Sequence, residues 1–164
     1  EDRRYTVGVL VQANHGRRSQ LMIDGVPVGR EIPDLLPERP DQPKSMLAVV
    51  ATDAPLLPLQ LRQLAKRVGL GMARTGAIST QSSGDLFLAF STAQRRGTAP
   101  VQPLAVLSDG QLTRLYQGVV EATEEAILNS LTMAQTMSGR EGRLIHALPL
   151  DRLVEVLRRY GRLK

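Results

Sequence analysis

Four polar side chains that could perform chemistry stand at the ends of apolar runs: Asn14, Ser45, Ser83 and Asp85. A serine hydroxyl can act as a nucleophile, a carboxylate can hold or receive a proton, and an asparagine amide can stabilise an oxyanion. Ser83 and Asp85 are two residues apart, so their side chains would share one face of a strand. On position alone, the commoner interpretation is structural: Ser45 begins a strand, Ser83 caps a loop and Asp85 lies in a turn.

A nucleophilic serine needs a base, and the histidines do not supply an obvious one. The chain has two, far apart in sequence: His15 in a predicted turn and His146 in a strand-like segment. Two routes remain open. One is a relay through a hydroxyl and a carboxylate. The other is the α-amine of Ser45, freed by cleavage of the Lys44–Ser45 bond, because an α-amine titrates near about pH 7.7 and can accept a proton at neutral pH.

The composition excludes several other classes of function. The 164 residues suit one domain, and the absence of cysteine excludes disulfides and thiolate chemistry. The net charge of +5 comes from scattered basic pairs, and with three Tyr and two Phe a base-stacking surface is not expected, so nucleic acid is not a predicted partner. No apolar run is long enough to span a membrane. Neither metal-ligand spacing nor a phosphate-binding loop is present.

Hydrophobic periodicity predicts the elements that would position these residues. Strands are expected at 5–12, 20–23, 26–28, 46–51, 85–92, 104–107 and 144–148, and helices at 57–72, 112–131 and 150–157. The strand at 5–12 is expected to be central, and the long helix to break near Thr123. Asp24-Gly25 predicts a hairpin turn, and the proline-rich stretch 31–44 predicts an exposed linker. The predicted class is α/β or α+β, with helices covering a mostly antiparallel sheet.

Six segments, spread along the chain in order, carry a resemblance to a known family: 5–14, 23–30, 45–56, 73–76, 83–93 and 157–163. Among them are Tyr-Thr-Val-Gly-Val-Leu-Val-Gln-Ala-Asn, Ser-Met-Leu-Ala-Val-Val-Ala-Thr-Asp-Ala-Pro-Leu and Ser-Gly-Asp-Leu-Phe-Leu-Ala-Phe-Ser-Thr-Ala. Together they resemble the DmpA-like family of L-aminopeptidase/D-amidase-esterases and β-peptidyl aminopeptidases. The resemblance implies a four-layer αββα sandwich similar to that of N-terminal-nucleophile hydrolases.

The resemblance also implies roles for individual residues. Family members cut themselves immediately before the nucleophile, which corresponds here to the bond between Lys44 and Ser45. Ser45 matches the nucleophile, Ser83 the second active-site serine, Asp85 the neighbouring acidic residue and Asn14 the oxyanion asparagine. The substrates implied are small peptides, amides or esters with a small free N-terminal amino acid, and the resemblance implies no cofactor.

The same resemblance implies how the chain is organised. Residues 1–164 would be one incomplete domain, the C-terminal part of the precursor. Residues 1–44, with the linker 31–44, would end the α fragment, and residues 45–164 would form the β fragment. The expected partners are the N-terminal fragment of the same precursor and further αβ units in a homo-oligomer. A cytoplasmic or periplasmic location is expected.

Two alternatives remain. Family members usually carry a small residue before the nucleophile, whereas this chain carries Lys44. That difference favours a catalytically silent relative that serves in binding or assembly. The ornithine acetyltransferases share the fold and the logic of cleavage but use threonine, so Ser45 argues against an acyltransferase.

Overall fold

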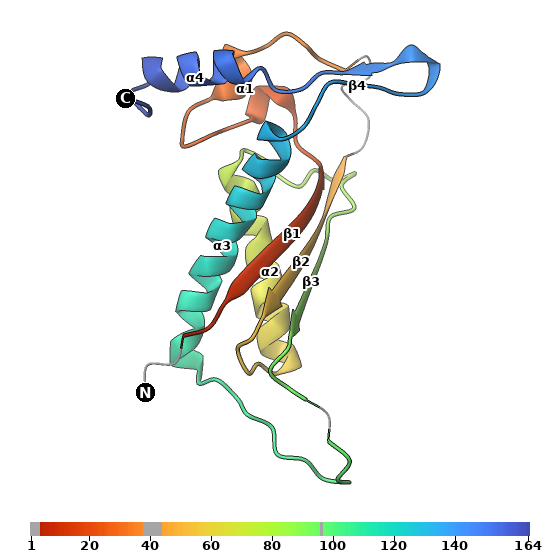
Figure 1. The fold of residues 1–164 in the computed structure, drawn as a ribbon, viewed down its shortest axis with the longest axis vertical. Coiled ribbons are helices and arrows are strands. Elements are labelled where there is room, and N and C mark those ends of the chain that lie inside the picture. The colour runs from red at the N-terminus through yellow and green to blue at the C-terminus, as the bar shows by residue number, and fades with distance from the viewer. Residues whose placement is uncertain (1–3, 38–43, 96) are drawn as a thin grey trace.

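A computed structural model describes residues 4–37, 44–95 and 97–164 (Figure 1). The elements in chain order are β1 (Val7–Asn14), a 3-10 turn η1 (Arg18–Gln20), α1 (Val28–Glu31), β2 (Ser45–Thr52), α2 (Pro58–Arg74), β3 (Leu86–Ser91), α3 (Asp109–Thr132), β4 (Met137–Ser138), a 3-10 turn η2 (Arg140–Gly142), β5 (Leu144–Ile145) and α4 (Leu150–Arg159). Of the linker expected at 31–44, residues 38–43 lie outside the described residues. Within the described ranges, every helix is too short or too polar to cross a membrane.

The apolar run at 46–51 forms β2, the middle strand of a three-stranded sheet in the order β1-β2-β3. β1 pairs with β2 antiparallel and β3 pairs with β2 in parallel, so the sheet is mixed and not mostly antiparallel as expected. β1 lies at an edge among the described strands, which corrects its expected central position. An edge strand can be apolar on both faces where further chain covers it.

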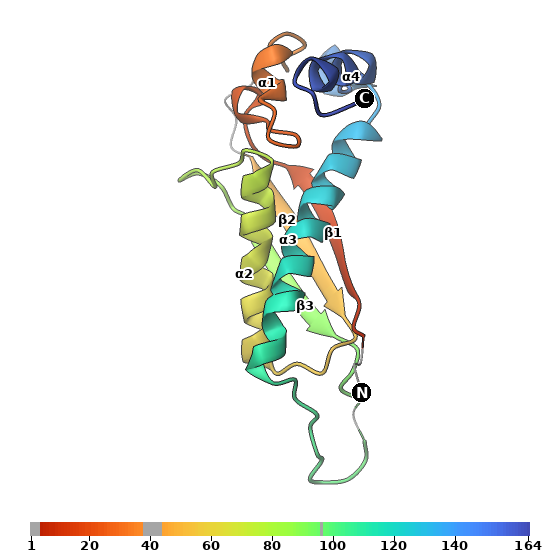
Figure 2. The ribbon, with the colours of Figure 1, turned by 90° about the vertical axis from the view of Figure 1, so that its left-hand side faces the viewer.

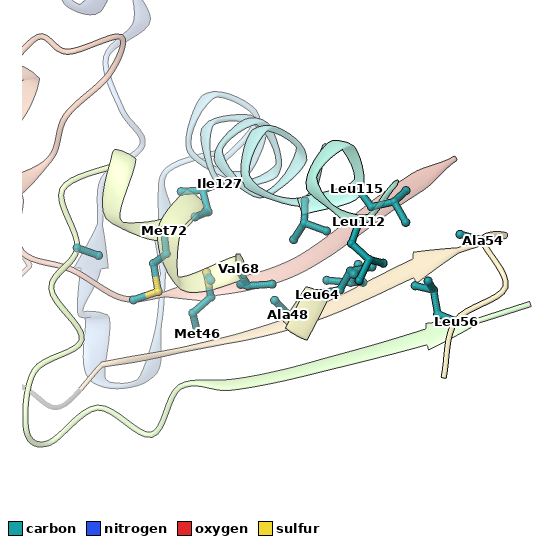
Figure 3. Packing of buried hydrophobic residues seen from close by; sticks show 13 residues of the cluster. Met46, Ala48, Ala54, Leu56, Leu64, Val68, Met72, Leu112, Leu115 and Ile127 are labelled. Atoms are coloured by element: carbon teal, nitrogen blue, oxygen red, sulfur yellow. The ribbon is translucent and has the colours of Figure 1, made fainter. Parts of the chain in front are cut away.

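Helices α2 and α3 cover one face of this sheet (Figure 2). Every second residue of β2 points into that layer, and Met46, Ala48 and Val50 are buried there. Figure 3 shows the side chains that they meet, Leu64, Val68 and Met72 from α2 and Leu112, Leu115 and Ile127 from α3. The helical spacing of these leucines and valines is the reason that both helices form against the sheet.

The other face of the sheet, which we call the outer face, is apolar and exposed. Leu47 of β2 is 45% exposed, and Leu88 of β3 is 55% exposed. Leu10, Leu86 and Phe90 are further exposed hydrophobic side chains of this face. Contiguous apolar surface of this kind marks a site of contact with further protein.

A second layer lies beyond the end of the sheet where β1 ends and β2 begins (Figure 1). There α1 and α4 form a separate apolar cluster that includes Val28, Ile32, Leu153 and Val156. Arg152 adds a bidentate ion pair to Asp34, with distances of 2.8 and 2.7 Å. This layer therefore stands next to the strand ends at which the candidate site residues are found.

Several predicted elements differ from the structure. The turn at Asp24-Gly25 is confirmed by positive φ at both residues, but the expected strands at 20–23 and 26–28 reduce to one isolated bridge. Residues 104–107 are not a strand, because Leu104 and Val106 are exposed and pair with no strand among the described residues. The long helix does not break at Thr123. The Thr123 hydroxyl donates to Val119 O at 2.7 Å, so its buried polar group is satisfied inside the helix.

Two glycines of α2 offer a matched test of the packing between α2 and α3. A Cβ on Gly71 would lie 2.5 Å from Val120 O and 2.6 Å from the Thr123 Cβ, whereas a Cβ on Gly69 would meet only Phe87 at 3.9 Å. We expect Gly71→Ala to lower the free energy of unfolding by about 1–3 kcal/mol through overpacking. Gly69→Ala should raise it, by up to about 1 kcal/mol, through helix propensity. Denaturant unfolding of the full-length protein checks both, and equal effects would contradict the close contact.

Candidate active site

The sheet register places Asn14 directly opposite Ser45. Asn14 is the last residue of β1 and Ser45 is the first residue of β2, and the two are paired in the antiparallel ladder. Met46 is buried on the helix-covered face, so by alternation the Ser45 side chain belongs to the outer face. The predicted nucleophile and the predicted oxyanion asparagine therefore meet at one end of the sheet, although they are 31 positions apart in sequence.

The backbone of Gly84 contacts the candidate nucleophile directly. Its N–H donates to the Ser45 Oγ at 2.9 Å. A Cβ at this position would lie 3.4 Å from the same oxygen, so the glycine leaves the hydroxyl accessible. The role of the Gly84 N–H was not predicted from the sequence. Its only signal was its place between Ser83 and Asp85, because a backbone donor is not visible in a residue type.

Asp85 connects the loop before β3 to the start of β2. Its Oδ1 accepts the Met46 N–H at 2.8 Å, while Oδ2 is buried and has no hydrogen bond of normal geometry within the described residues. Burial raises the pKa of the Asp85 carboxyl. Hydrogen bonding by Ser83, by the Met46 N–H and by Ser79 lowers the pKa by more than burial raises it, so the pKa lies below its usual value. Asp85 is thus a carboxylate at neutral pH. The structure brings it together with Ser83 and the residue after Ser45.

His15 also approaches this carboxylate. Burial lowers the pKa of the His15 imidazole, and the charge of Asp85 partly offsets that effect. The ring is thus mostly neutral at neutral pH, and its Nδ1 is buried without a hydrogen-bond partner among the described residues. His146 lies in a different segment, after β5, and has no described contact with Ser45. No described hydrogen bond joins either histidine to the serine, as a histidine base would require.

The lysine before the nucleophile is half-buried and ends the segment that leads into β2. No group of three or more His, Cys, Asp or Glu side chains within the described ranges could hold a metal ion. The described groups are those that nucleophilic chemistry requires, and Ser45 stays the predicted attacking hydroxyl. The amide donors of Gly84 and Asn14 stand at the same end of the sheet, where a developing negative charge would need them.

Comparisons with known proteins agree with this geometry. The model of Peptidase family S58 matches residues 1–145. Beta-peptidyl aminopeptidase BapA of Sphingosinicella xenopeptidilytica is 41% identical over 174 residues, covering 96% of this chain and 43% of the relative. The chain thus spans less than half the length of that relative.

Two solved structures are similar over nearly the whole chain. One is a protein from Pyrococcus horikoshii OT3, 44% identical with a TM-score of 0.90, covering 99% of this chain and 45% of that one. The other is L-aminopeptidase D-Ala-esterase/amidase from Ochrobactrum anthropi, 42% identical with a TM-score of 0.90, covering 98% and 45%. The latter is described as a new variant among the Ntn hydrolase fold. The expected α/β fold of the N-terminal-nucleophile type is confirmed.

The hydrogen bond between Asp85 and the Met46 N–H can be tested by measuring stability as a function of pH. Because the folded-state pKa of Asp85 is depressed, its stabilisation is present above the usual carboxyl pKa of about 3.9 and is lost as pH falls through the folded-state value. At neutral pH we expect Asp85→Asn to lower the free energy of unfolding by about 1 kcal/mol. The difference from the wild type should shrink below about pH 4.

The matched control is Asp53→Asn. Asp53 accepts the Thr6 N–H at 2.7 Å near the opposite end of the sheet. Amide hydrogen exchange of the full-length protein should accelerate at Met46 only in the Asp85 variant and at Thr6 only in the Asp53 variant. An unchanged exchange rate at Met46 in Asp85→Asn would show that the carboxylate does not hold the start of β2.

Proposed function

The chain belongs to peptidase family S58, and from that premise we propose that it carries the nucleophile of a self-processing serine aminopeptidase or amidase. The observation that supports this most strongly is the 2.9 Å hydrogen bond from the Gly84 N–H to the Ser45 Oγ. That bond fixes the hydroxyl of the first residue of β2 beside a backbone donor and opposite Asn14. Residues 1–44 would then close the α fragment and residues 45–164 would form the β fragment.

Cleavage of the Lys44–Ser45 bond would provide the base. It frees the α-amine of Ser45, which lies on the same residue as the hydroxyl and is partly unprotonated at neutral pH. In the substrate reaction this amine takes the proton from Oγ while Oγ bonds to the scissile carbonyl carbon. The carbon–nitrogen bond then breaks, and the ammonium returns the proton to the leaving amine. Water hydrolyses the resulting ester of Ser45 and restores the hydroxyl.

Charge develops on the carbonyl oxygen during each attack. The Gly84 N–H donates to the Ser45 hydroxyl, and Asn14 stands opposite Ser45 in the register, so we assign these two residues as the oxyanion donors. Donors fixed in advance of the reaction stabilise such an oxyanion without reorganisation. Asp85 acts indirectly: its carboxylate holds the Met46 N–H, and with Ser83 it sets the position of the loop that presents Gly84.

The outer face of the sheet is where we place the rest of the precursor. Ser45 belongs to this face, which is apolar and uncovered in the described residues. A second sheet packed on it would complete a four-layer αββα sandwich and enclose the nucleophile between the two sheets. We propose the N-terminal fragment of the same precursor as this partner, with αβ units assembling into a homo-oligomer. The proposed substrates are small peptides, amides or esters with a small free N-terminal residue, including β-residues.

Lys44 supports one competing function, a catalytically silent relative that serves in assembly. Its side chain is long and charged where the reactive peptide bond of a self-cleaving precursor must bend into the site. A silent relative would keep the packing of β2 and the contact of Asp85 with Met46, but it would not need a hydroxyl at Ser45.

Substitution of Ser45 separates these two functions. In the full-length precursor, we expect Ser45→Ala to reduce hydrolysis of a small amino-acid amide by at least about 10³-fold, because the nucleophile is lost. Asn14→Ala should lower kcat by about 10²-fold through loss of an oxyanion donor. Release of the free amino acid is the measurement.

The control is Ser82→Ala, which removes an exposed hydroxyl two residues before Gly84 and should leave the rate unchanged. Retained hydrolysis in Ser45→Ala, or no hydrolysis by the wild type, would contradict the enzyme proposal and favour the silent relative.

A further inference from the structure

A cavity of about 830 Å³ lies between the strand ends and the layer of α1 and α4. Its walls come from the end of β1, the loop after α2, the last turns of α3, the segment around α1 and the start of the segment after β5. Ala13, His15 and Lys44 line it, and these residues immediately flank Asn14 and Ser45 in sequence. The cavity therefore lies at the same end of the sheet as the proposed active site, on the side of the strand ends that faces the layer of α1 and α4.

The lining of this cavity is basic. Arg17, Arg18, Arg30 and Lys44 contribute to it, together with His15 and His146, and no Asp or Glu is among its lining residues. Arg18 is already engaged, since it donates to Ile32 O at 3.1 Å and to Asp34 O at 3.0 Å. Among the described residues, no ion pair involves Arg17, Arg30 or Lys44. Their charge is available to an incoming anion.

Backbone contacts hold in place the segment 17–30, which carries the three arginines of the lining. The Met22 N–H donates to Thr75 O and the Gly29 N–H donates to Leu21 O, both at 3.1 Å. A Cβ on Gly29 would lie 1.6 Å from Arg18 O, and a Cβ on Gly76 would lie 1.7 Å from Gln20 O. Both glycines thus permit the backbone of residues 18–20 to lie against its neighbours. A site whose backbone is fixed before binding loses less conformational entropy when the ligand binds.

The chemical class of the ligand follows from the mixture of charge and apolar surface. Leu21, Ile127, Leu131 and Leu148 form much of the rest of the lining. A cavity of this size and composition suits a small molecule with an apolar body and one anionic group. Arginine side chains recognise a carboxylate with particular strength.

We infer that this cavity binds the carboxylate-bearing leaving part of a short peptide substrate, an inference that rests on the proposed aminopeptidase function. A free peptide has a cationic amino end and an anionic carboxyl end, and a basic cavity without carboxylates can accept only the second. An extended residue spans about 3.3–3.6 Å, so a carboxylate one or two residues after the scissile bond can pass the strand ends and reach a cavity that is lined by Lys44, the residue before Ser45. Cleavage after Lys44 leaves a carboxylate on that residue, and this carboxylate offsets the positive charge of the Lys44 side chain. We therefore assign Arg17 and Arg30 as the residues that recognise the substrate carboxylate.

Kinetics on a matched pair of substrates tests this inference. In the full-length protein, alanyl-leucine and its carboxamide alanyl-leucinamide differ only in the carboxylate. We expect the double variant Arg17→Gln/Arg30→Gln to raise KM for the acid by about 10-fold or more and to leave KM for the amide and both kcat values unchanged. Both arginines are exposed, so folding should be retained. The control is Arg114→Gln on α3, an exposed arginine outside the cavity lining. Equal changes for acid and amide, or none, would overturn the inference.

A binding measurement decides the same point without turnover. Calorimetry with N-acetyl-leucine and N-acetyl-leucinamide compares the carboxylate and its amide as ligands that have no free amino end. We expect the acid to bind about 10-fold or more tightly than the amide, and this preference to disappear in the double variant. Equal affinity for the two in the wild type would overturn the inference. If neither dipeptide is hydrolysed, the aminopeptidase proposal fails, and the calorimetry still decides the carboxylate site.

Discussion

The hydrogen bonds between the Ser83–Asp85 loop and the start of β2 are the constraint on which the rest of the site depends. Asp85 accepts the Met46 N–H, and Gly84 donates to the Ser45 Oγ one residue earlier. These two bonds fix the loop before β3 against the first two residues of β2, which follows the proline-rich segment. Asn14 joins them because antiparallel pairing sets its register opposite Ser45. An ionised Asp85 makes its bond stronger than a neutral acceptor would.

The two faces of the sheet have different roles. The face that packs on α2 and α3 holds the core and gives β2 a fixed position, with Met46 and Val50 fully buried. The outer face carries the proposed nucleophile among exposed leucines such as Leu47 and Leu88. A catalytic hydroxyl between two apolar layers would be shielded from bulk water, which strengthens every electrostatic contact around it. The basic cavity lies on the opposite side of the strand ends, next to the α1 and α4 layer.

Sequence patterns predicted the elements whose burial is periodic. The run at 46–51 became β2, and the spaced leucines became α2 and α3, because hydrophobic burial decides such segments. The short strands at 20–23 and 26–28 failed because two or three residues carry too little burial to show a period. The edge position of β1 depends on strand order, which no local pattern contains. Among site groups, Asn14, Ser45, Ser83 and Asp85 could be proposed from residue type and resemblance, whereas the Gly84 N–H and the approach of His15 to Asp85 arise only from the fold.

If Ser45 becomes an N-terminal nucleophile, the purified full-length protein contains a fragment that begins with Ser45, so the amino-terminal residue of each fragment is the decisive measurement. Edman sequencing, combined with periodate treatment that selectively oxidises an N-terminal serine, identifies the new terminus. We predict two fragments, one of which begins at Ser45 and reacts with periodate. A chain that stays intact, or a fragment that begins at any other residue, would contradict it.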